Sequence, residues 1–427
     1  MKRNIALVFL SVLSGVSFVD AENVEQMRDS TKKIISESPN FVEIDVSAYK
    51  HNLKVVKNMI GEHVKLCAVM KSDAYGHGIS NLIDTTVNSP EVDCIAAVDN
   101  KEFAVIYPKI QQSGRDIKAL RIAPVTKNEL IEAINNDWDI EEIIGFYEQA
   151  KMISETAQKM SEILGREIII KVSINIETGM GRMAFREVED IKKAMQLPHL
   201  KVVGVMTHFA KDYESEDIAK SATKEQLAKF DEIVSQLDLP KDVIKHVANS
   251  GAASKYPWAR KDMVRVGSLI YGEDIDDLQD PKHELRPVMK SFRSEVAIIE
   301  RNVPPHSPIN YDAEQYTRSD KQSTTATLRT GYDYGFPEKA YASRMQVIIN
   351  GVKYPVIGKT SMNMLVVDIT DEPENNKVKI GDQALLVGKS GNEYISWNQF
   401  AKQNNMSITK EILTVGNLNK KVNTVND

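Results

Sequence analysis

The sequence has few cysteines, no excess of positive charge and no glycine-rich dinucleotide motif. Only Cys67 and Cys94 occur in 427 residues, which leaves one possible disulfide within the chain. Lysine and arginine number 54 against 60 acidic residues, and the net charge of −6 shows no sign of a nucleic-acid-binding surface. No G-x-G-x-x-G motif comes after the first apolar, strand-like run at Cys67–Met70, which argues against a dinucleotide-binding sheet.

Long apolar runs are also lacking, except at the N-terminus. Lys2 and Arg3 precede the apolar run Ile5–Phe18, and Val19-Asp20-Ala21 offers a small-residue cleavage site. This order is typical of a secretory signal peptide, so we expect export and removal of residues 1–21. An uncleaved membrane anchor is the alternative, and the run is short for a spanning helix.

Eight short apolar runs come next, and most gaps between them hold amphipathic, helix-compatible segments. The runs are Cys67–Met70, Cys94–Val98, Leu120–Ala123, Ile140–Ile144, Ile168–Ile174, Val202–Met206, Ile244–Ala248 and Met263–Val266. Eight strands alternating with helices over about 200 residues predict an α/β fold with a (β/α)8 TIM barrel. A doubly wound open sheet is the alternative.

The rhythm changes near Glu284, where strand signals continue without long helices. These signals cover Ser294–Ile299, Thr324–Leu328, Met345–Ile349, Tyr354–Ile357, Met364–Ile369 and Gln383–Val387. We predict a barrel over residues 40–283 and a mostly antiparallel β domain over residues 284–420. The alternating segment at residues 40–46 is expected to contribute a strand to the second domain, and the tail from Asn417 is expected to be frayed.

The two cysteines open the first and second barrel strands. If these strands are parallel neighbours, Cys67 and Cys94 lie at matching heights about 4.8 Å apart, which is close to disulfide geometry. Export to an oxidising compartment favours the bond. Two buried free thiols are the alternative.

Reactive side chains lie just past the predicted strands, at the end of a barrel where active sites form. The first strand leads into Lys71 and Tyr75, and a lysine in a partly desolvated pocket has a lowered pKa that suits Schiff-base chemistry. Later strands lead into Arg182, His208, His246, Asn249, Ser250, Arg265, Gly267 and Ser268. Singly, these are explained as core histidines, surface charges or turns; together they suit a site for pyridoxal 5′-phosphate (PLP).

At these residues the sequence resembles the alanine racemase family, from about Phe41 to Val415. The strongest motif is Ala68–Gly78, AVMKSDAYGHG, which is similar to the PLP-lysine signature of the family. The supporting motifs are, in order, Thr178–Arg182, Thr207–Phe209, Ala248–Ser250, Met263–Gly267, Asn310–Asp312 and Ser361–Asn363. The resemblance implies a PLP-dependent barrel with a β domain after it.

The resemblance also implies a role for each matched residue. Lys71 would hold PLP and act as the base on one face of the substrate, and Tyr311 of a partner subunit would act on the other, in a homodimer with shared active sites. His208 would orient Tyr311, and Arg265 would face the pyridine nitrogen. The other cofactor residues would be Tyr75, Asn249, Ser250, Gly267 and Ser268, and the other substrate residues Arg182, Met362 and Asn363.

The sequence departs from the family pattern at three places. Asn175 stands where many members carry a carbamylated lysine, so we expect a chloride or water beside Arg182. Asn363 replaces an aspartate, and Thr409–Ile412 offers no counterpart of a phosphate-contacting tyrosine. With the signal peptide and the cysteine pair, these features resemble the periplasmic broad-specificity racemases, which interconvert lysine, arginine, methionine and alanine and supply D-amino acids to the cell envelope.

Four other functions compete with this one. An alanine-specific racemase shares the same motifs. A PLP-dependent decarboxylase would place an acid at the pyridine nitrogen, where Arg265 stands. A non-catalytic PLP-binding protein would be a single barrel without Tyr311, and an exported solute-binding protein would need two α/β lobes.

Overall fold

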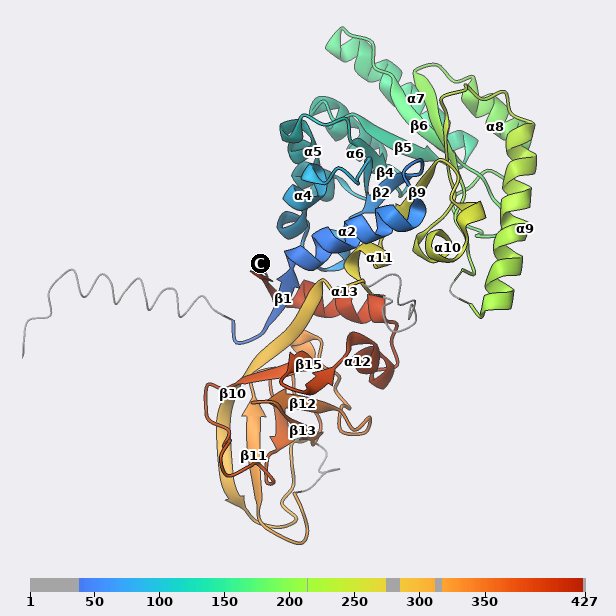
Figure 1. Ribbon diagram of the computed structural model, residues 1–427. Helices are drawn as coiled ribbons and strands as arrows, with labels where there is room; N and C mark the ends of the chain where they lie inside the picture. The colour runs from blue at the N-terminus through green and yellow to red at the C-terminus, as the bar shows by residue number, and fades with distance from the viewer. Residues whose placement is uncertain (1–37, 213, 274–284, 312–316, 425–427) are drawn as a thin grey trace, which may run out of the picture. The chain divides into compact units, whose positions relative to one another are not determined.

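The computed structural model describes residues 38–212, 214–273, 285–311 and 317–424. The helices and strands belong to the unit Asn40–Asp427, and the strands form two sheets (Figure 1). The predicted signal peptide at residues 1–21 lies outside the described residues. Within the described ranges, no helix combines the length and apolar character needed to cross a membrane.

The first sheet is parallel and has eight strands. They are β2 (Lys65–Val69), β3 (Cys94–Ala97), β4 (Lys118–Arg121), β5 (Ile140–Ile144), β6 (Ile170–Asn175), β7 (Leu200–Met206), β8 (Ile244–His246) and β9 (Met263–Val266). Strands β2 to β8 neighbour one another in chain order, and β9 pairs with β2. Backbone hydrogen bonds from Asp262 N–H to Lys245 O and from Arg265 N–H to Ala248 O close the sheet. The predicted barrel is confirmed, and the open-sheet alternative is excluded.

Helices connect the barrel strands and cover their outer face (Figure 1). They are α2 (Val46–Ile60), α3 (Lys71–Tyr75), α4 (Ile79–Asn88), α5 (Asn100–Ser113), α6 (Lys127–Asn135), α7 (Tyr147–Leu164), α8 (Val188–Met195), α9 (Glu216–Ser235), α10 (Ser250–Lys255), η1 (Pro257–Ala259) and α11 (Ser268–Tyr271). Strands β3 and β5 are buried along their whole length, because one face packs on helices and the other lines the barrel interior. In β3 this double burial gives a continuous apolar run, whereas β5 buries Glu141 and Glu142 between its isoleucines.

Alternation along the strands decides which side chains enter the barrel. A cluster of buried side chains fills the interior: Cys67, Val69, Cys94, Ala96, Leu120, Ile143, Met206 and Met263. Because the side-chain period of a strand is two residues, Lys71 continues the inward series of β2 and Arg265 that of β9. The strand register therefore directs both cations toward the carboxyl end of the barrel.

The second sheet has nine strands and is mostly antiparallel. They are β1 (Phe41–Asp45), β10 (Met289–Val303), β11 (Ser323–Leu328), β12 (Gln346–Ile349), β13 (Val352–Ile357), β14 (Leu365–Asp368), β15 (Gln383–Ser390), β16 (Glu393–Ile395) and β17 (Lys420–Thr424). Strand β1 pairs with β10, so segments on both sides of the barrel build this sheet. The predicted combination of a barrel and a mostly antiparallel sheet is confirmed, whereas the exact domain limits stay a prediction.

The tail differs from its prediction. Residues Asn417–Thr424 are not frayed: α13 (Ile408–Leu418) runs into them, and β17 pairs in parallel with β1. A second unpredicted helix, α12 (Trp397–Gln403), precedes α13. A polar, lysine-rich segment becomes a strand here because a distant strand offers it an edge, which local composition does not reveal.

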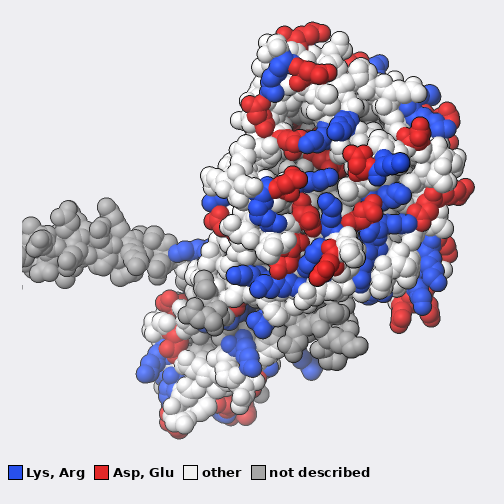
Figure 2. Space-filling view, turned by 45° about the horizontal axis from the view of Figure 1, so that its top comes forward, with Lys and Arg blue, Asp and Glu red and all other residues white. Residues whose placement is uncertain are grey.

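The surface of the barrel carries charges of both signs. On the face shown in Figure 2, lysine and arginine side chains are interspersed with aspartate and glutamate. Among the described residues of the barrel, ion pairs join Lys261 with Asp231 at 2.7 Å and Lys109 with Asp84 at 2.8 Å. This face has no region of a single charge.

Candidate active site

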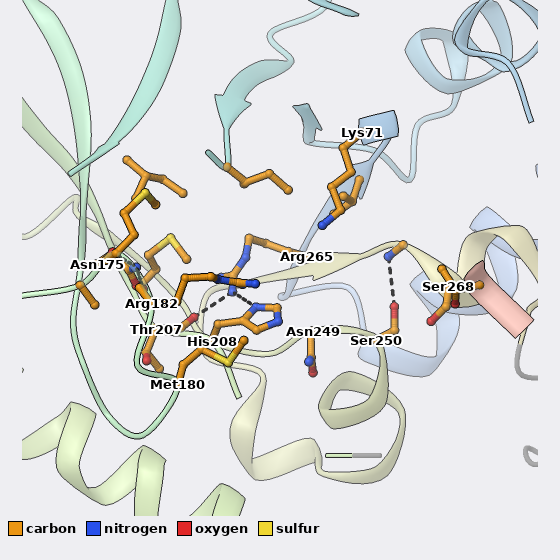
Figure 3. A pocket seen from close by; sticks show the side chains of 18 of the residues that line it. Lys71, Asn175, Met180, Arg182, Thr207, His208, Asn249, Ser250, Arg265 and Ser268 are labelled. Carbon is orange, nitrogen blue, oxygen red and sulfur yellow. Dashed lines mark hydrogen bonds between the residues drawn. The ribbon is translucent and has the colours of Figure 1, made fainter. Parts of the chain in front are cut away.

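A cavity of about 480 Å³ lies at the carboxyl ends of the barrel strands (Figure 3). It brings together most of the residues singled out in the sequence: Lys71, Tyr75, Asn175, Arg182, His208, Asn249, Ser250, Arg265, Gly267 and Ser268. Lys71 and Arg265 point into the same space, with Asn175 and Met180 on one side and Ser250 and Ser268 on the other (Figure 3).

Lys71 stands where β2 ends and the chain enters a left-handed turn. The φ angles of Ser72, Asp73, Ala74 and Tyr75 lie between 53° and 55°. This region costs an L-residue about 1–2 kcal/mol, and such strain persists only where surrounding contacts fix it. Burial lowers the pKa of the Lys71 amine, and so do the nearby guanidinium groups.

His77 and Tyr271 pack against this turn and hydrogen-bond to its backbone and to the end of β2. Ala74 O accepts a hydrogen bond from His77 Nδ1–H at 2.9 Å, within the loop that comes after Lys71. The imidazole stacks on Tyr271 with ring centroids 4.6 Å apart, and the Tyr271 hydroxyl donates to Val69 O at 2.9 Å. Burial lowers the pKa of His77 to about 4, so the ring is neutral and structural.

Tyr75, Ser250 and Gly267 form a polar cradle at one end of the cavity. Gly267 N–H donates to Ser250 Oγ at 3.0 Å, which leaves the Ser250 hydroxyl proton to donate elsewhere. A Cβ at Gly267 would lie 2.5 Å from Tyr75 Oη, so only glycine fits. Hydroxyl and backbone N–H groups in such a concavity are typical phosphate ligands.

Arg265 is the buried cation of the site. Its Nη1 lies 3.0 Å from His246 Nδ1, and its Nη2 donates to Thr207 O at 2.8 Å and contacts His208 Nδ1 at 3.4 Å. Burial, and then the charge of Arg182, lowers the pKa of Arg265 to about 10. The guanidinium therefore stays protonated at neutral pH and presents only donors.

A chain of polar groups continues from Arg265 across the barrel interior. Because Arg265 can only donate, His246 Nδ1 accepts and its proton resides on Nε2, which donates to Ser173 Oγ at 3.0 Å. The Ser173 hydroxyl then donates to Glu141. A Cβ at Gly204 would lie 2.0 Å from Ser173 Oγ, so this glycine leaves the space that the chain needs.

His208 is neutral for an electrostatic reason. Burial and, after it, the charges of Arg265, Arg182 and Lys71 lower its pKa to about 3. Since Nδ1 faces the Arg265 donor, the proton of His208 belongs on Nε2. His208 can thus donate one hydrogen bond but does not carry a charge.

Asn175 braces the loop that comes after β6. Its Nδ2 donates to the main-chain carbonyl of Met183 and, at 3.5 Å, to that of Arg182. The amide thus holds the loop backbone rather than the guanidinium of Arg182. Met180, Met183 and Met206 line the cavity as well.

Tyr311, Met362 and Asn363 are not brought to the cavity. The described wall includes none of them, and Tyr311 and Met362 are 64% and 53% exposed in the β domain. Asn363 Nδ2 donates to Asp333 Oδ2 at 3.3 Å, which fixes this loop on the surface.

The end of the chain contributes to the cavity wall through Ser407, Ile408 and Thr409, at the start of α13. The resemblance pointed to Thr409 as part of a segment without the family's phosphate-contacting tyrosine, whereas Ser407 and Ile408 were missed. Thr409 Oγ1 donates to Glu273 Oε2 at 2.7 Å. Glu141 and Ser173 were missed because they lie inside strands, where a polar residue usually indicates a solvent-facing position.

Cys67 and Cys94 face each other below the cavity. They are register partners on β2 and β3, with Cα atoms 4.2 Å apart, and their sulfur atoms are bonded. Both are buried in the barrel interior.

Two family models together match most of the chain. The alanine racemase N-terminal domain matches residues 44–274, and the alanine racemase C-terminal domain matches residues 289–425. The chain belongs to the alanine racemase family. This family is PLP-dependent and its members are amino acid racemases, so the chain is an enzyme of the isomerase class.

Individual relatives agree with this family. A broad specificity amino-acid racemase of Vibrio parahaemolyticus is 31% identical over 391 residues, covering 89% of this chain and 88% of that protein. A lysine racemase of Proteus mirabilis is 30% identical over 388 residues, covering 90% and 89%. The solved alanine racemase of Clostridium difficile is 27% identical with a TM-score of 0.79, covering 91% and 97%.

Proposed function

We propose that this racemase uses PLP in a two-base mechanism and accepts long as well as short amino acid side chains. The observation that carries the proposal is one cavity holding Lys71, Arg265 and the cradle of Tyr75, Ser250 and Gly267. These groups fit PLP, because they offer an amine for its aldehyde, a donor for its ring nitrogen and donors for its phosphate. When bound, PLP supplies the electron sink that makes the Cα–H bond of an amino acid acidic.

The residues of the barrel hold the cofactor and serve one face of the substrate. Burial lowers the pKa of Lys71, so its Nζ is suited to accept and return a proton at Cα. Arg265 keeps its own proton, so it would offer the ring nitrogen of PLP a hydrogen bond without protonating it, which would favour reprotonation at Cα over side reactions. Asn249, Ser250, Gly267 and Ser268 complete the cofactor site.

Tyr311 serves the other face from a second copy of the chain. Its phenol is largely exposed and does not line the cavity of its own chain. In a homodimer, Tyr311 would reach the partner's cavity, together with the neighbouring surface loop of Met362 and Asn363. The Nε2–H of His208 would orient the phenol there.

The cavity wall favours a broad substrate range. Methionine side chains are unbranched and adapt to ligands of different shape, and three of them line this cavity: Met180, Met183 and Met206. Asn175 and Arg182 lie at the same wall, and we assign a bound chloride to this pair as the anion for Arg182. Relatives named broad specificity amino-acid racemase and lysine racemase support this proposal, whereas an alanine-specific enzyme is the second candidate.

Export completes the proposal. A periplasmic racemase would supply D-lysine, D-arginine, D-methionine and D-alanine to the cell envelope rather than to the cytoplasm. N-terminal sequencing of the protein released from the periplasm should find Glu22 as the first residue, after loss of residues 1–21.

The function is tested on residues 22–427. We expect an absorbance band at about 420 nm for bound PLP, absent in Lys71→Ala. Chiral chromatography should then find D-products from L-lysine, L-arginine and L-methionine at rates comparable to alanine. Turnover of alanine alone would show the alanine-specific enzyme, and a yellow protein without any D-product would overturn racemisation.

A further inference from the structure

We propose that Glu102 is the positioning residue for Lys71. Its carboxylate holds the left-handed turn that aims the Lys71 amine into the cavity and supplies the negative charge that opposes the nearby guanidinium groups. The inference rests on the proposed role of Lys71 in holding PLP, and it adds a residue that no motif of the sequence indicated.

One carboxylate joins two backbone segments. Glu102 is the third residue of α5 and is only 8% exposed. Its Oε2 accepts the N–H of Asp99 at 3.5 Å, as part of the capping box of the helix, and the N–H of Val98 at 2.8 Å. Its Oε1 accepts the N–H of Asp73 at 3.2 Å, two residues after Lys71.

The turn needs such a partner because its backbone is strained. Four successive non-glycine residues, Ser72–Tyr75, have positive φ, and each is held there only by its contacts. The side chain of Asp73 is already engaged, since Oδ1 accepts Ile79 N–H at 2.8 Å and Oδ2 pairs with Lys421 at 3.4 Å. For the N–H of Asp73, Glu102 supplies the acceptor.

Glu102 also balances the charge around Lys71. Burial contributes most to the lowered pKa of the lysine, Arg182 and Arg265 lower it further, and Glu102 acts in the opposite direction. The other described groups facing the turn are Tyr75, whose ring centre lies 6.0 Å from Lys71 Nζ, the neutral His77 and His208, the buried Tyr271, and the paired Asp73 and Lys421. Asp99, at the start of α5, is engaged in the capping box.

The chain contains a matched control on the next helix. Glu129 occupies the same third position of α6, and its Oε2 accepts the N–H of Thr126 at 2.9 Å in a second capping box. Its described hydrogen bonds and its ion pair with Arg121 involve no residue of the Lys71 turn. Glu129→Gln therefore reproduces the loss of a capping carboxylate without touching the turn.

The test measures how the apoprotein recombines with added PLP at a series of pH values. In Glu102→Gln we expect the pH at which the recombination rate is half-maximal to decrease. Loss of the Glu102 charge should lower the pKa of Lys71, so the reactive neutral amine forms at lower pH. The maximal recombination rate, the plateau reached at high pH, should fall by about tenfold, because the turn no longer holds the Lys71 amine in its orientation toward the cavity. Glu102→Asp keeps the charge but is too short to reach Asp73, so only its plateau should fall. Glu129→Gln should change neither quantity.

The outcomes separate this inference from the proposed function. If Glu102→Gln recombines as the wild type does in both midpoint and plateau, Glu102 is only a helix cap and the inference is overturned. If Glu102→Gln fails to fold, Glu102→Asp decides alone: a lower plateau supports positioning, and an unchanged plateau overturns it. Failure of the wild-type apoprotein to bind PLP would instead overturn the proposed cofactor role of Lys71.

Discussion

Gly204 shows how a single missing Cβ shapes this site. A Cβ there would lie 2.0 Å from Ser173 Oγ and 2.9 Å from Glu141 Oε1. We expect Gly204→Ala to destabilise the protein by about 1–3 kcal/mol through overpacking. It should also displace the His246 acceptor from Arg265 and so change the absorbance of bound PLP. Thermal unfolding of the apoprotein and the visible spectrum of the holoprotein measure the two effects.

A second substitution separates crowding from hydrogen bonding. In Gly204→Ala combined with Ser173→Ala, the colliding hydroxyl is gone, so part of the stability should return. The spectral change should remain, because His246 still lacks its partner Ser173. A Gly204→Ala protein with the melting temperature and spectrum of the wild type would contradict this account of the interior chain.

Tyr311 gives the sharpest prediction for the two-base mechanism. We expect Tyr311→Phe to lower racemisation by about a hundredfold to ten-thousandfold, the usual range for loss of a general acid–base group. Lys71 should still exchange the Cα proton of one enantiomer with D₂O, without inversion. Mass spectrometry after chiral separation detects both events. Tyr394→Phe, at another exposed tyrosine, should behave as the wild type, and equal exchange of both enantiomers by Tyr311→Phe would argue against two bases.

At the residue scale, the sequence reveals the residues at the end of a strand better than the polar residues inside it. Lys71, Arg265 and Gly267 were found because strand ends meet at one edge of a barrel. Glu102 was missed because one carboxylate both caps α5 and accepts the N–H of Asp73. A glutamate at this position of a helix is already accounted for by the capping box, so the sequence gives no sign of the second contact. Tyr311 came from a motif, since nothing in its surroundings within one chain indicates catalysis.

At the element scale, β2 and β3 carry the next prediction. Their register sets Cys67 opposite Cys94. Alkylation in denaturant without reductant should therefore label neither thiol in the exported protein, and prior reduction should expose both. Reduction should lower the free energy of unfolding by about 3 kcal/mol in the chain-entropy account. Urea unfolding measures this difference, Cys67→Ala should be insensitive to reductant, and two labelled thiols before reduction would contradict the bond.

The same scale explains which elements the sequence revealed. The barrel strands were located because they are buried on both faces and therefore read as short apolar runs. Strand β17 and helix α13 were not located. The strand depends on pairing with the edge of β1. The helix depends on packing against the turn after Lys71, where Leu413 Cα would lie 3.1 Å from a Cβ at Gly76. Long-range partners of this kind leave no local pattern.

At the scale of the whole molecule, the question is whether one active site needs two chains. If the chain forms a homodimer whose sites need both residues, Lys71→Ala and Tyr311→Phe should each remove nearly all activity from every site. If Tyr311 acts in the partner's cavity, a dimer with one chain of each kind contains one intact site and one doubly defective site. Random reassortment of equal amounts should therefore restore about a quarter of the wild-type activity, because half of the dimers are mixed and each has one of two sites.

The mixing experiment has a built-in control. Each variant, unfolded and refolded alone, should remain inactive, and so should a mixture in which one chain carries both substitutions and the other only Lys71→Ala. Activity in the first mixture alone would place Lys71 and Tyr311 of different chains in one site. If the first mixture stays inactive while mass measurement shows mixed dimers, Tyr311 serves its own chain, and the exposed phenol must reach the cavity by a rearrangement within one subunit.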